Sequence, residues 1–237
     1  MAEALIVKNI PREGPGLLGS ILEEEGVAYE TLDPSADPLP DPSLYRAVIV
    51  LGGPDSANDA TPKMEAELTF ARRALEAGVP YLGICLGLQV LIKAAGGRVY
   101  PNALKEVGFR SPDREYFTVE LTAAGARDPL FEGLPLTMQV FQLHGETVDP
   151  PKGAVLLARG RYCENQALRI GKAYGLQYHA ELTQEMLLRW AREDEDLRGI
   201  PVDELLEDYR GMMDEYVEDG RRLFKNFLRA SGLLWSG

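Results

Sequence analysis

Residues 78–97 read GVPYLGICLGLQVLIKAAGG and combine a buried strand with a helix. The apolar run Val79–Ile84 is typical of a strand covered on both faces, as in a parallel sheet. After it, apolar residues recur at helical spacing until the pair Gly96-Gly97 ends the helix. Cys85 falls at the corner between strand and helix. This unit predicts an α/β fold.

Two similar strand-and-helix units come earlier in the chain. The apolar run Ala4–Val7 is followed by a turn and a helix expected over about Gly16–Glu25. A second buried strand, Arg46–Leu51, ends at Gly52-Gly53-Pro54, and a helix with Thr61 as N-cap follows it. Strands that alternate with helices predict three layers, with a mostly parallel central sheet and flanking helices.

The pattern changes after residue 115. Residues 116–178 are rich in strand signals, so we expect a smaller β-rich and partly antiparallel part there. Helical periodicity returns over about 182–237. With 237 residues and no internal repeat, we expect a single domain over 1–237. The five expected strands of the β-rich part are Tyr116–Leu121, Met138–Leu143, Ala154–Ala158, Gln166–Ile170 and Ala173–Tyr178.

Composition argues against several classes of function. The chain has 25 Lys and Arg against 37 Asp and Glu, a net charge of −12, which disfavours nucleic-acid partners and anionic membrane surfaces. No apolar run approaches the roughly 20 residues of a membrane span, and no signal peptide is visible. The two cysteines cannot form a disulfide framework. We therefore expect a cytoplasmic protein without nucleic-acid or membrane partners.

Cys85 is a candidate nucleophile. Gly83 and Gly87 flank it in a tight strand-to-helix turn, the arrangement of a nucleophile elbow, in which glycines relieve crowding. The N-terminus of the following helix would favour the reactive thiolate. The alternative interpretation is a buried structural cysteine at a crowded turn.

A cysteine nucleophile needs a base, and the chain has only two histidines, His144 and His179. Because Glu181 stands two residues after His179, both side chains would project from the same side of an extended segment. The carboxylate could then orient the imidazole, as in hydrolytic triads. Two alternatives remain: His179 and Glu181 are a strand-end histidine and a solvated glutamate, or the base is His144, with Glu146 at the same spacing.

Three segments together resemble the class I glutamine amidotransferases in their order and spacing. They are Gly83–Gln89 at the elbow, Gly52–Pro54 after the second strand, and Gly175–Glu181. Residues 105–109 and 143–146 are similar to the glutaminase part of GMP synthetase. The resemblance implies a flavodoxin-like α/β glutaminase domain that needs no cofactor and no metal.

The resemblance also implies roles for individual residues. Cys85 would attack the side-chain amide carbon of glutamine and form a γ-glutamyl thioester, while His179 passes a proton to the leaving ammonia and Glu181 orients His179. The main-chain N–H groups of Gly53 and Leu86 would form the oxyanion hole. The amino-acid end of glutamine would contact Gln89, Leu143, Gly145 and Glu146.

The chain departs from the family pattern in two ways. Ala180 stands where the family usually has proline, so the sequence pre-organises the triad less. No phosphate loop or synthetase domain follows residue 181, so the ammonia acceptor is expected on a separate synthetase subunit. Two other functions remain: hydrolysis of another γ-glutamyl compound, as a γ-glutamyl hydrolase or peptidase, and a catalytically silent protein that senses glutamine.

Four further motifs each allow a structural interpretation as well as a functional one. Gly14–Gly19 matches Gly-x-Gly-x-x-Gly, which indicates either a dinucleotide site or a tight turn. Gly52–Ser56 resembles the loop of ATP pyrophosphatases, but Leu51 stands in place of its first serine. Cys163 lacks an elbow and is expected to be structural or exposed. The acidic run Glu193–Asp196 is expected to be a solvated helix end rather than a metal site.

Overall fold

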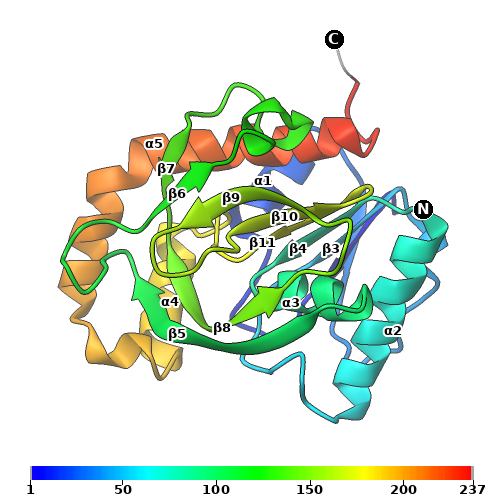
Figure 1. The fold of residues 1–237 in the computed structure, drawn as a ribbon, viewed down its shortest axis with the longest axis horizontal. Coiled ribbons are helices and arrows are strands. Elements are labelled where there is room, and N and C mark those ends of the chain that lie inside the picture. The colour runs from blue at the N-terminus through cyan, green and yellow to red at the C-terminus, as the bar shows by residue number, and fades with distance from the viewer. Residues whose placement is uncertain (1, 236–237) are drawn as a thin grey trace.

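The computed structural model describes residues 2–235 as a large sheet with helices on both faces and a smaller two-stranded sheet beside it (Figure 1). The large sheet has the strand order β2-β1-β3-β4-β11-β10-β9-β6-β7. Its strands are β1 (Ala4–Val7), β2 (Tyr29–Leu32), β3 (Ala47–Val50), β4 (Tyr81–Ile84), β6 (Thr118–Leu121), β7 (Thr137–Gln139), β9 (Val155–Gly160), β10 (Ala167–Ile170) and β11 (Ala173–Leu176). The small sheet pairs β5 (Arg98–Gly108) with β8 (Gln142–Asp149).

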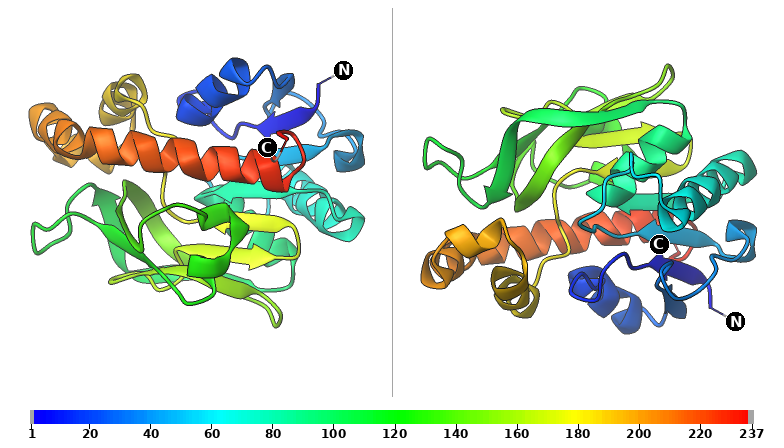
Figure 2. Two further views of the ribbon diagram at one scale, coloured as in Figure 1. Left: turned by 90° about the horizontal axis from the view of Figure 1, so that it is seen from above. Right: turned by 90° about the horizontal axis from the view of Figure 1, so that it is seen from below.

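Five α-helices complete the layers (Figure 2). They are α1 (Gly16–Glu24), α2 (Pro62–Ala77), α3 (Leu86–Ala94), α4 (Gln184–Glu193) and α5 (Val202–Ala230). Successive strand residues point to opposite faces of a sheet. Accordingly, Ala4 and Ile6 of β1 pack in one apolar cluster with α1 and the end of α5, whereas Leu5 and Val7 pack in another with α2 and α3. This arrangement confirms the three-layer α/β fold.

The large sheet is mixed rather than mostly parallel. Strands β2, β1, β3, β4 and β11 pair in parallel, and β11, β10, β9, β6 and β7 pair antiparallel. Most of the β-rich region therefore extends the same sheet, because its strands add to the edge that β11 leaves free. Only β5 and β8 form a sheet of their own.

The strand expected at Met138–Leu143 was wrong in its boundaries. The chain leaves β7 at Gln139, at the edge of the large sheet, and enters β8 of the small sheet at Gln142. An apolar run shows that residues are buried, but it does not show which of two sheets buries them. Strands β2 and β5 were not predicted, since the residues of β2, and most of those of β5, are only half-buried or exposed.

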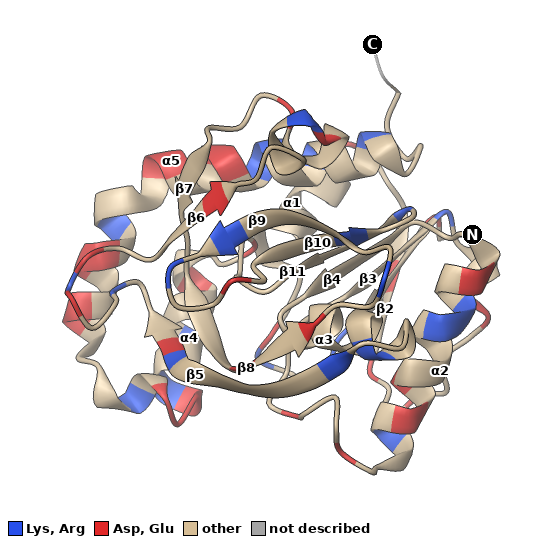
Figure 3. Ribbon diagram, viewed as in Figure 1, with Lys and Arg blue, Asp and Glu red and all other residues tan. Residues whose placement is uncertain are grey.

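The chain from residue 182 onward packs as helices against the end of the sheet. Side chains of α4 and of the first half of α5 form a third apolar cluster with Phe109 and Phe141. Acidic and basic residues lie along α2 and α5 (Figure 3), as expected for helices with one face in water. Within residues 2–235, no helix combines the length and the apolar character needed to cross a membrane.

Candidate active site

Cys85 occupies a strained corner between β4 and α3. Its φ of 51° and ψ of −106° lie in a region that side-chain-bearing residues rarely adopt. Its N–H donates to the carbonyl of Leu176 in β11, at 2.7 Å. A Cβ added to Gly83 would lie 2.3 Å from the oxygen of Gly87, and one added to Gly87 would lie 2.0 Å from that of Val50. Positions 83 and 87 therefore both require glycine, because neighbouring main-chain atoms lie too close to leave room for a Cβ.

The thiol of Cys85 faces a pocket at the carboxyl end of the parallel strands. Cys85 is 6% exposed, and its Sγ lies 3.6 Å from the carbonyl oxygen of Leu143 in β8. It is also the N-cap of α3, where the helix dipole favours a negative charge. The position therefore suits a thiolate nucleophile.

His179 and Glu181 form a buried pair. Oε1 of Glu181 lies 2.6 Å from Nδ1 of His179, and both side chains are almost inaccessible. The hydroxyl of Tyr216 donates to the carbonyl of His179 at 2.8 Å, and the ring of Trp190 packs on the imidazole with centroids 4.9 Å apart. These contacts hold the imidazole in one orientation, and Glu181 favours the tautomer with a proton on Nδ1.

The pKa of His179 is raised well above its ordinary value of 6.5. Burial of the ring lowers this pKa, but the charge of Glu181 and hydrogen bonds to Cys85 and Glu181 outweigh that effect. Cys85 and His179 line the same pocket. A cysteine beside a histidine that a carboxylate orients is an arrangement that can serve as nucleophile and base.

A pocket of about 610 Å³ opens over these residues. Glu181 does not line it and lies behind His179. The turn after β3 borders it, where a Cβ on Gly53 would lie 2.7 Å from Cβ of Asn9 and 3.2 Å from Cδ2 of Leu86. The other eight site residues expected from the sequence all line the pocket: Gly53, Cys85, Leu86, Gln89, Leu143, Gly145, Glu146 and His179.

The four residues expected to contact substrate lie on α3 and β8. Nε2 of Gln89 is 3.4 Å from Oε1 of Gln177 and 3.5 Å from the carbonyl oxygen of Glu146. The carboxylate of Glu146 accepts a hydrogen bond from Oγ of Ser56 at 3.1 Å. This bond joins β8 to the loop after β3, so the two walls of the pocket are connected.

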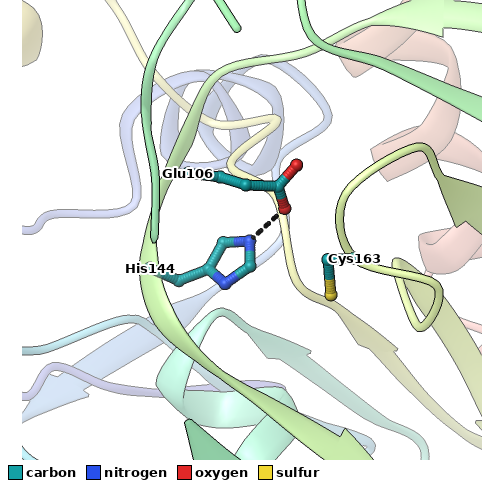
Figure 4. Close-up of side chains that lie close together, drawn as sticks. All are labelled: Glu106, His144 and Cys163. Atoms are coloured by element: carbon teal, nitrogen blue, oxygen red, sulfur yellow. Dashed lines mark ion pairs between the residues drawn. The ribbon is translucent and has the colours of Figure 1, made fainter. Parts of the chain in front are cut away.

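A second group of cysteine, histidine and glutamate lies nearby (Figure 4). Nε2 of His144 is 2.8 Å from Oε2 of Glu106, and Nδ1 is 2.9 Å from the carbonyl oxygen of Glu146. Each ring nitrogen of His144 therefore lies close to an oxygen atom other than those of the Glu146 carboxylate. The carboxylate of Glu146 bonds Ser56 instead of this ring, so His144 and Glu146 do not form the alternative pair that their spacing allowed.

Cys163 completes this second group but does not line the pocket. It is 1% exposed, so of the two expected alternatives, structural or exposed, the burial agrees with the structural one. Its Sγ lies 3.2 Å from the hydroxyl of Thr147, and burial raises the pKa of the thiol to about 11. The ligand atoms of Glu106, His144 and Cys163 lie within 4.8 Å of one another. A metal would require the thiolate, so this environment suits a structural network better than a metal site.

The loop after β1 supplies two pocket residues that sequence reasoning missed, Arg12 and Glu13. Glu13 is 4% exposed, and its Oε2 has no hydrogen-bond donor within residues 2–235. Burial raises its pKa to about 7; His179 and Arg12 lower it, and Glu181 raises it. Only the position of this loop at the carboxyl edge of a parallel strand could have pointed to it.

The acidic segment 193–196 also lines the pocket. Asp194 is 8% exposed and pairs with Arg12 at 2.5 Å, and Asp196 pairs with Lys105 at 2.5 Å. The expectation of a solvated helix end therefore holds for the exposed Glu193 and Glu195 but was wrong for Asp194. Long-range ion pairs bring this segment to the site.

The glycine motif at Gly14–Gly19 serves packing at the start of α1. Gly16 has a φ of 46°, and a Cβ there would lie 2.1 Å from the carbonyl oxygen of Glu181. The end of α1 that a dinucleotide phosphate would approach is thus occupied by the backbone of the triad segment. This contact supports the tight-turn interpretation.

Comparisons with known proteins agree with this geometry. The family model for "Glutamine amidotransferase class-I" matches residues 22–187. The chain is 32% identical over 157 residues to a gamma-glutamyl-L-1-hydroxyisopropylamide hydrolase of Pseudomonas sp, a match covering 62% of this chain and 52% of that protein. It is 34% identical over 144 residues to one subunit of the glutamine-hydrolyzing GMP synthase of Methanoregula boonei, covering 60% of this chain and 68% of that subunit.

Other relatives are longer than this chain, which covers only 24% of one GMP synthase that it matches. Among solved structures, a glutamine amidotransferase from Thermotoga maritima superposes with a TM-score of 0.85 at 28% identity, covering 96% of this chain and 98% of that one. The family model and this superposition both extend over most of the chain, so the chain belongs to the class I glutamine amidotransferase family.

Proposed function

We propose that this protein hydrolyses the side-chain amide of glutamine to glutamate and ammonia, with Cys85 as nucleophile. One observation carries the proposal: Cys85 on its strained elbow and His179, which is paired with the buried Glu181, line one pocket that is large enough for an amino acid. We also propose that residues 1–237 form a single glutamine amidotransferase domain, to which the helices after residue 182 belong.

In the first step, the thiolate of Cys85 attacks the amide carbon. The negative charge that develops on the carbonyl oxygen would be stabilised by the N–H groups of Gly53 and Leu86, which border the same pocket. The protonated imidazole of His179 gives its proton to the amide nitrogen, the C–N bond breaks, and ammonia leaves. The product on the enzyme is a γ-glutamyl thioester.

In the second step, water attacks the thioester. His179 takes a proton from the water, the C–S bond breaks, and glutamate leaves with the thiolate restored. Glu181 stabilises the imidazolium in both steps and fixes the ring tautomer. The raised pKa of His179 supports this scheme, because it favours the imidazolium that protonates the leaving group.

The fate of the ammonia is a further part of the proposal. One relative is a GMP synthase subunit rather than a whole synthase, so we propose that a separate synthetase subunit receives the ammonia. A second candidate is hydrolysis of another γ-glutamyl amide. The similarity to the Pseudomonas hydrolase favours it, since the name of that enzyme specifies a γ-glutamyl amide other than glutamine.

Covalent capture with a diazoketone analogue of glutamine tests the proposal without the partner protein. Peptide mapping should find the label on Cys85, and excess glutamine should block it. Cys163 serves as an internal control, because it is buried outside the pocket and its raised pKa disfavours the thiolate. Cys85→Ser should remove the label. Labelling of Cys163 in place of Cys85, or labelling that glutamine does not block, would contradict the proposal.

A further inference from the structure

The lining of the pocket is rich in acidic side chains. Seven acidic residues line the pocket, against Arg12, Lys105 and the two histidines. Arg12 and Lys105 are paired with acids of the same lining, Asp194 and Asp196, and Asp55 pairs with Lys63. Glu195 is exposed and has no ion-pair partner within the described chain. The seven acidic residues are Glu13, Asp55, Glu146, Glu193, Asp194, Glu195 and Asp196.

Glu13 is placed at the leaving nitrogen. A Cβ on Gly52 would lie 2.3 Å from Oε2 of Glu13 and 3.1 Å from Cε1 of His179, so both side chains border the same point. In the proposed mechanism His179 protonates the leaving nitrogen, so that nitrogen passes close to Glu13. Oε2 of Glu13 is buried without a donor in residues 2–235. An N–H of the departing amine would supply the missing hydrogen bond.

The acidic segment 193–196 is linked to the loop that carries Glu13. Arg12, which precedes Glu13, pairs with Asp194. The carbonyl oxygen of Arg12 accepts a hydrogen bond from the indole of Trp190, and this ring packs on His179. Segment 193–196 is therefore tied to the His179 side of the pocket. Asp196 of this segment pairs with Lys105 of β5 at 2.5 Å. A group attached to the leaving nitrogen would extend past Glu13 toward these acids.

We propose that the preferred substrate is a γ-glutamyl amide whose amine portion carries a second, cationic amino group, as in γ-glutamyl derivatives of aliphatic diamines. This inference rests on the second candidate function, hydrolysis of a γ-glutamyl amide other than glutamine by the same Cys85 chemistry, and names its substrate class. Hydrolysis would add water across the same C–N bond and release glutamate and the diamine. The cation would be attracted by Glu195, since Glu193 already pairs with Arg189 at 3.0 Å, while an anionic tail at the same place would be repelled.

Three amides that differ only in the tail test the inference: γ-glutamylputrescine, with a terminal ammonium, γ-glutamylpentylamide, with a methyl group there, and γ-glutamyl-5-aminovalerate, with a carboxylate. The kcat/KM for the cationic amide should exceed that for the neutral one by about tenfold or more, since a cleft lined by one sign of charge concentrates the opposite ion. The carboxylate compound should be the poorest. The ratio of kcat/KM for the cationic amide to that for the neutral amide should fall at high salt, because salt screens charges near the surface.

The variant Glu195→Gln should lower the cationic-to-neutral ratio of kcat/KM severalfold. Glu120→Gln is the matched control, since Glu120 is exposed on β6 and does not line the pocket. Equal kcat/KM for the cationic and neutral amides, with both hydrolysed, would overturn this inference and leave the proposed function standing.

Calorimetry with the Cys85→Ser variant gives a second measure that needs no turnover. γ-Glutamylputrescine should bind more tightly than γ-glutamylpentylamide, and equal affinities would also overturn the inference. Failure of the wild-type protein to hydrolyse any amide, together with failure of the diazoketone to label Cys85, would instead contradict the proposed function and this inference with it.

Discussion

The N–H of Leu17, at the start of α1, donates to the carbonyl oxygen of Glu181 at 2.9 Å. This hydrogen bond joins the first helix to the segment that carries His179 and Glu181, although more than 160 residues separate them in the chain. The close approach depends on Gly16, whose φ is 46°. The geometry of the triad is therefore held in part by a turn that carries none of its residues.

Gly16→Ala should destabilise the protein and reduce its activity together. The added methyl group would meet the carbonyl oxygen of Glu181 at 2.1 Å, which requires the backbone to shift. We expect the free energy of unfolding to fall by about 1–3 kcal/mol, as for overpacked sites, and glutaminase kcat to fall with it. Gly14→Ala is the control, because no atom lies within 4 Å of the Cβ it would add. Similar urea unfolding midpoints for the two variants would refute this explanation.

Replacing the nucleophile should reveal the strain at the elbow. Cys85→Gly should be more stable than Cys85→Ala by about 1 kcal/mol, because glycine adopts a φ of 51° without the usual cost of roughly 1–3 kcal/mol. Neither variant should be labelled by the diazoketone. Thermal unfolding measures the difference, and a less stable glycine variant would show that the backbone at Cys85 is unstrained.

Glu181→Gln should lower kcat with little change in KM. The carboxylate contacts Nδ1 of His179 but does not line the pocket, so substrate binding should persist. In hydrolytic triads the amide substitution of the orienting carboxylate costs about 10,000-fold in kcat. Where turnover of wild type is too slow to measure, the rate of Cys85 labelling provides the comparison. Glu120→Gln controls for removal of one charge, and an unchanged rate for Glu181→Gln would exclude an orienting role.

Glu13 should make stability depend on pH. Its pKa in the folded protein is about 7 against an ordinary 4.5, so between these values the folded protein binds the proton more tightly than the unfolded chain. Glu13 therefore adds to the free energy of unfolding at low pH, and this contribution is lost as the pH rises through about 7. The loss should be about 3 kcal/mol, from ~1.4 kcal/mol per pKa unit. Glu13→Gln should remove this part of the pH dependence, which urea unfolding at pH 5 and pH 8 would measure. Parallel stability profiles for the two proteins would show that Glu13 does not titrate in this range.

Local patterns in the sequence determined the α/β class, the three strand-and-helix units of the first hundred residues, and the elbow at Cys85. Each depends on residues close in the chain: an apolar run long enough for a buried strand, a helical stripe that a glycine ends, and glycines on both sides of one cysteine. The two-residue spacing of His179 and Glu181 is also a local pattern, because an extended segment alone brings the two side chains to one side.

Only the tertiary structure decided how distant segments meet. It paired β5 with β8, extended the large sheet with the antiparallel strands, placed His144 beside Glu106, and brought Glu13 and residues 193–196 to the pocket. Strand partners and long-range ion pairs depend on how the whole chain packs, whereas hydrophobic periodicity records only which face of a segment is buried. The sequence by itself therefore identified the residues proposed to break the amide bond, and the packing of remote segments around them determined the acidic lining of the pocket.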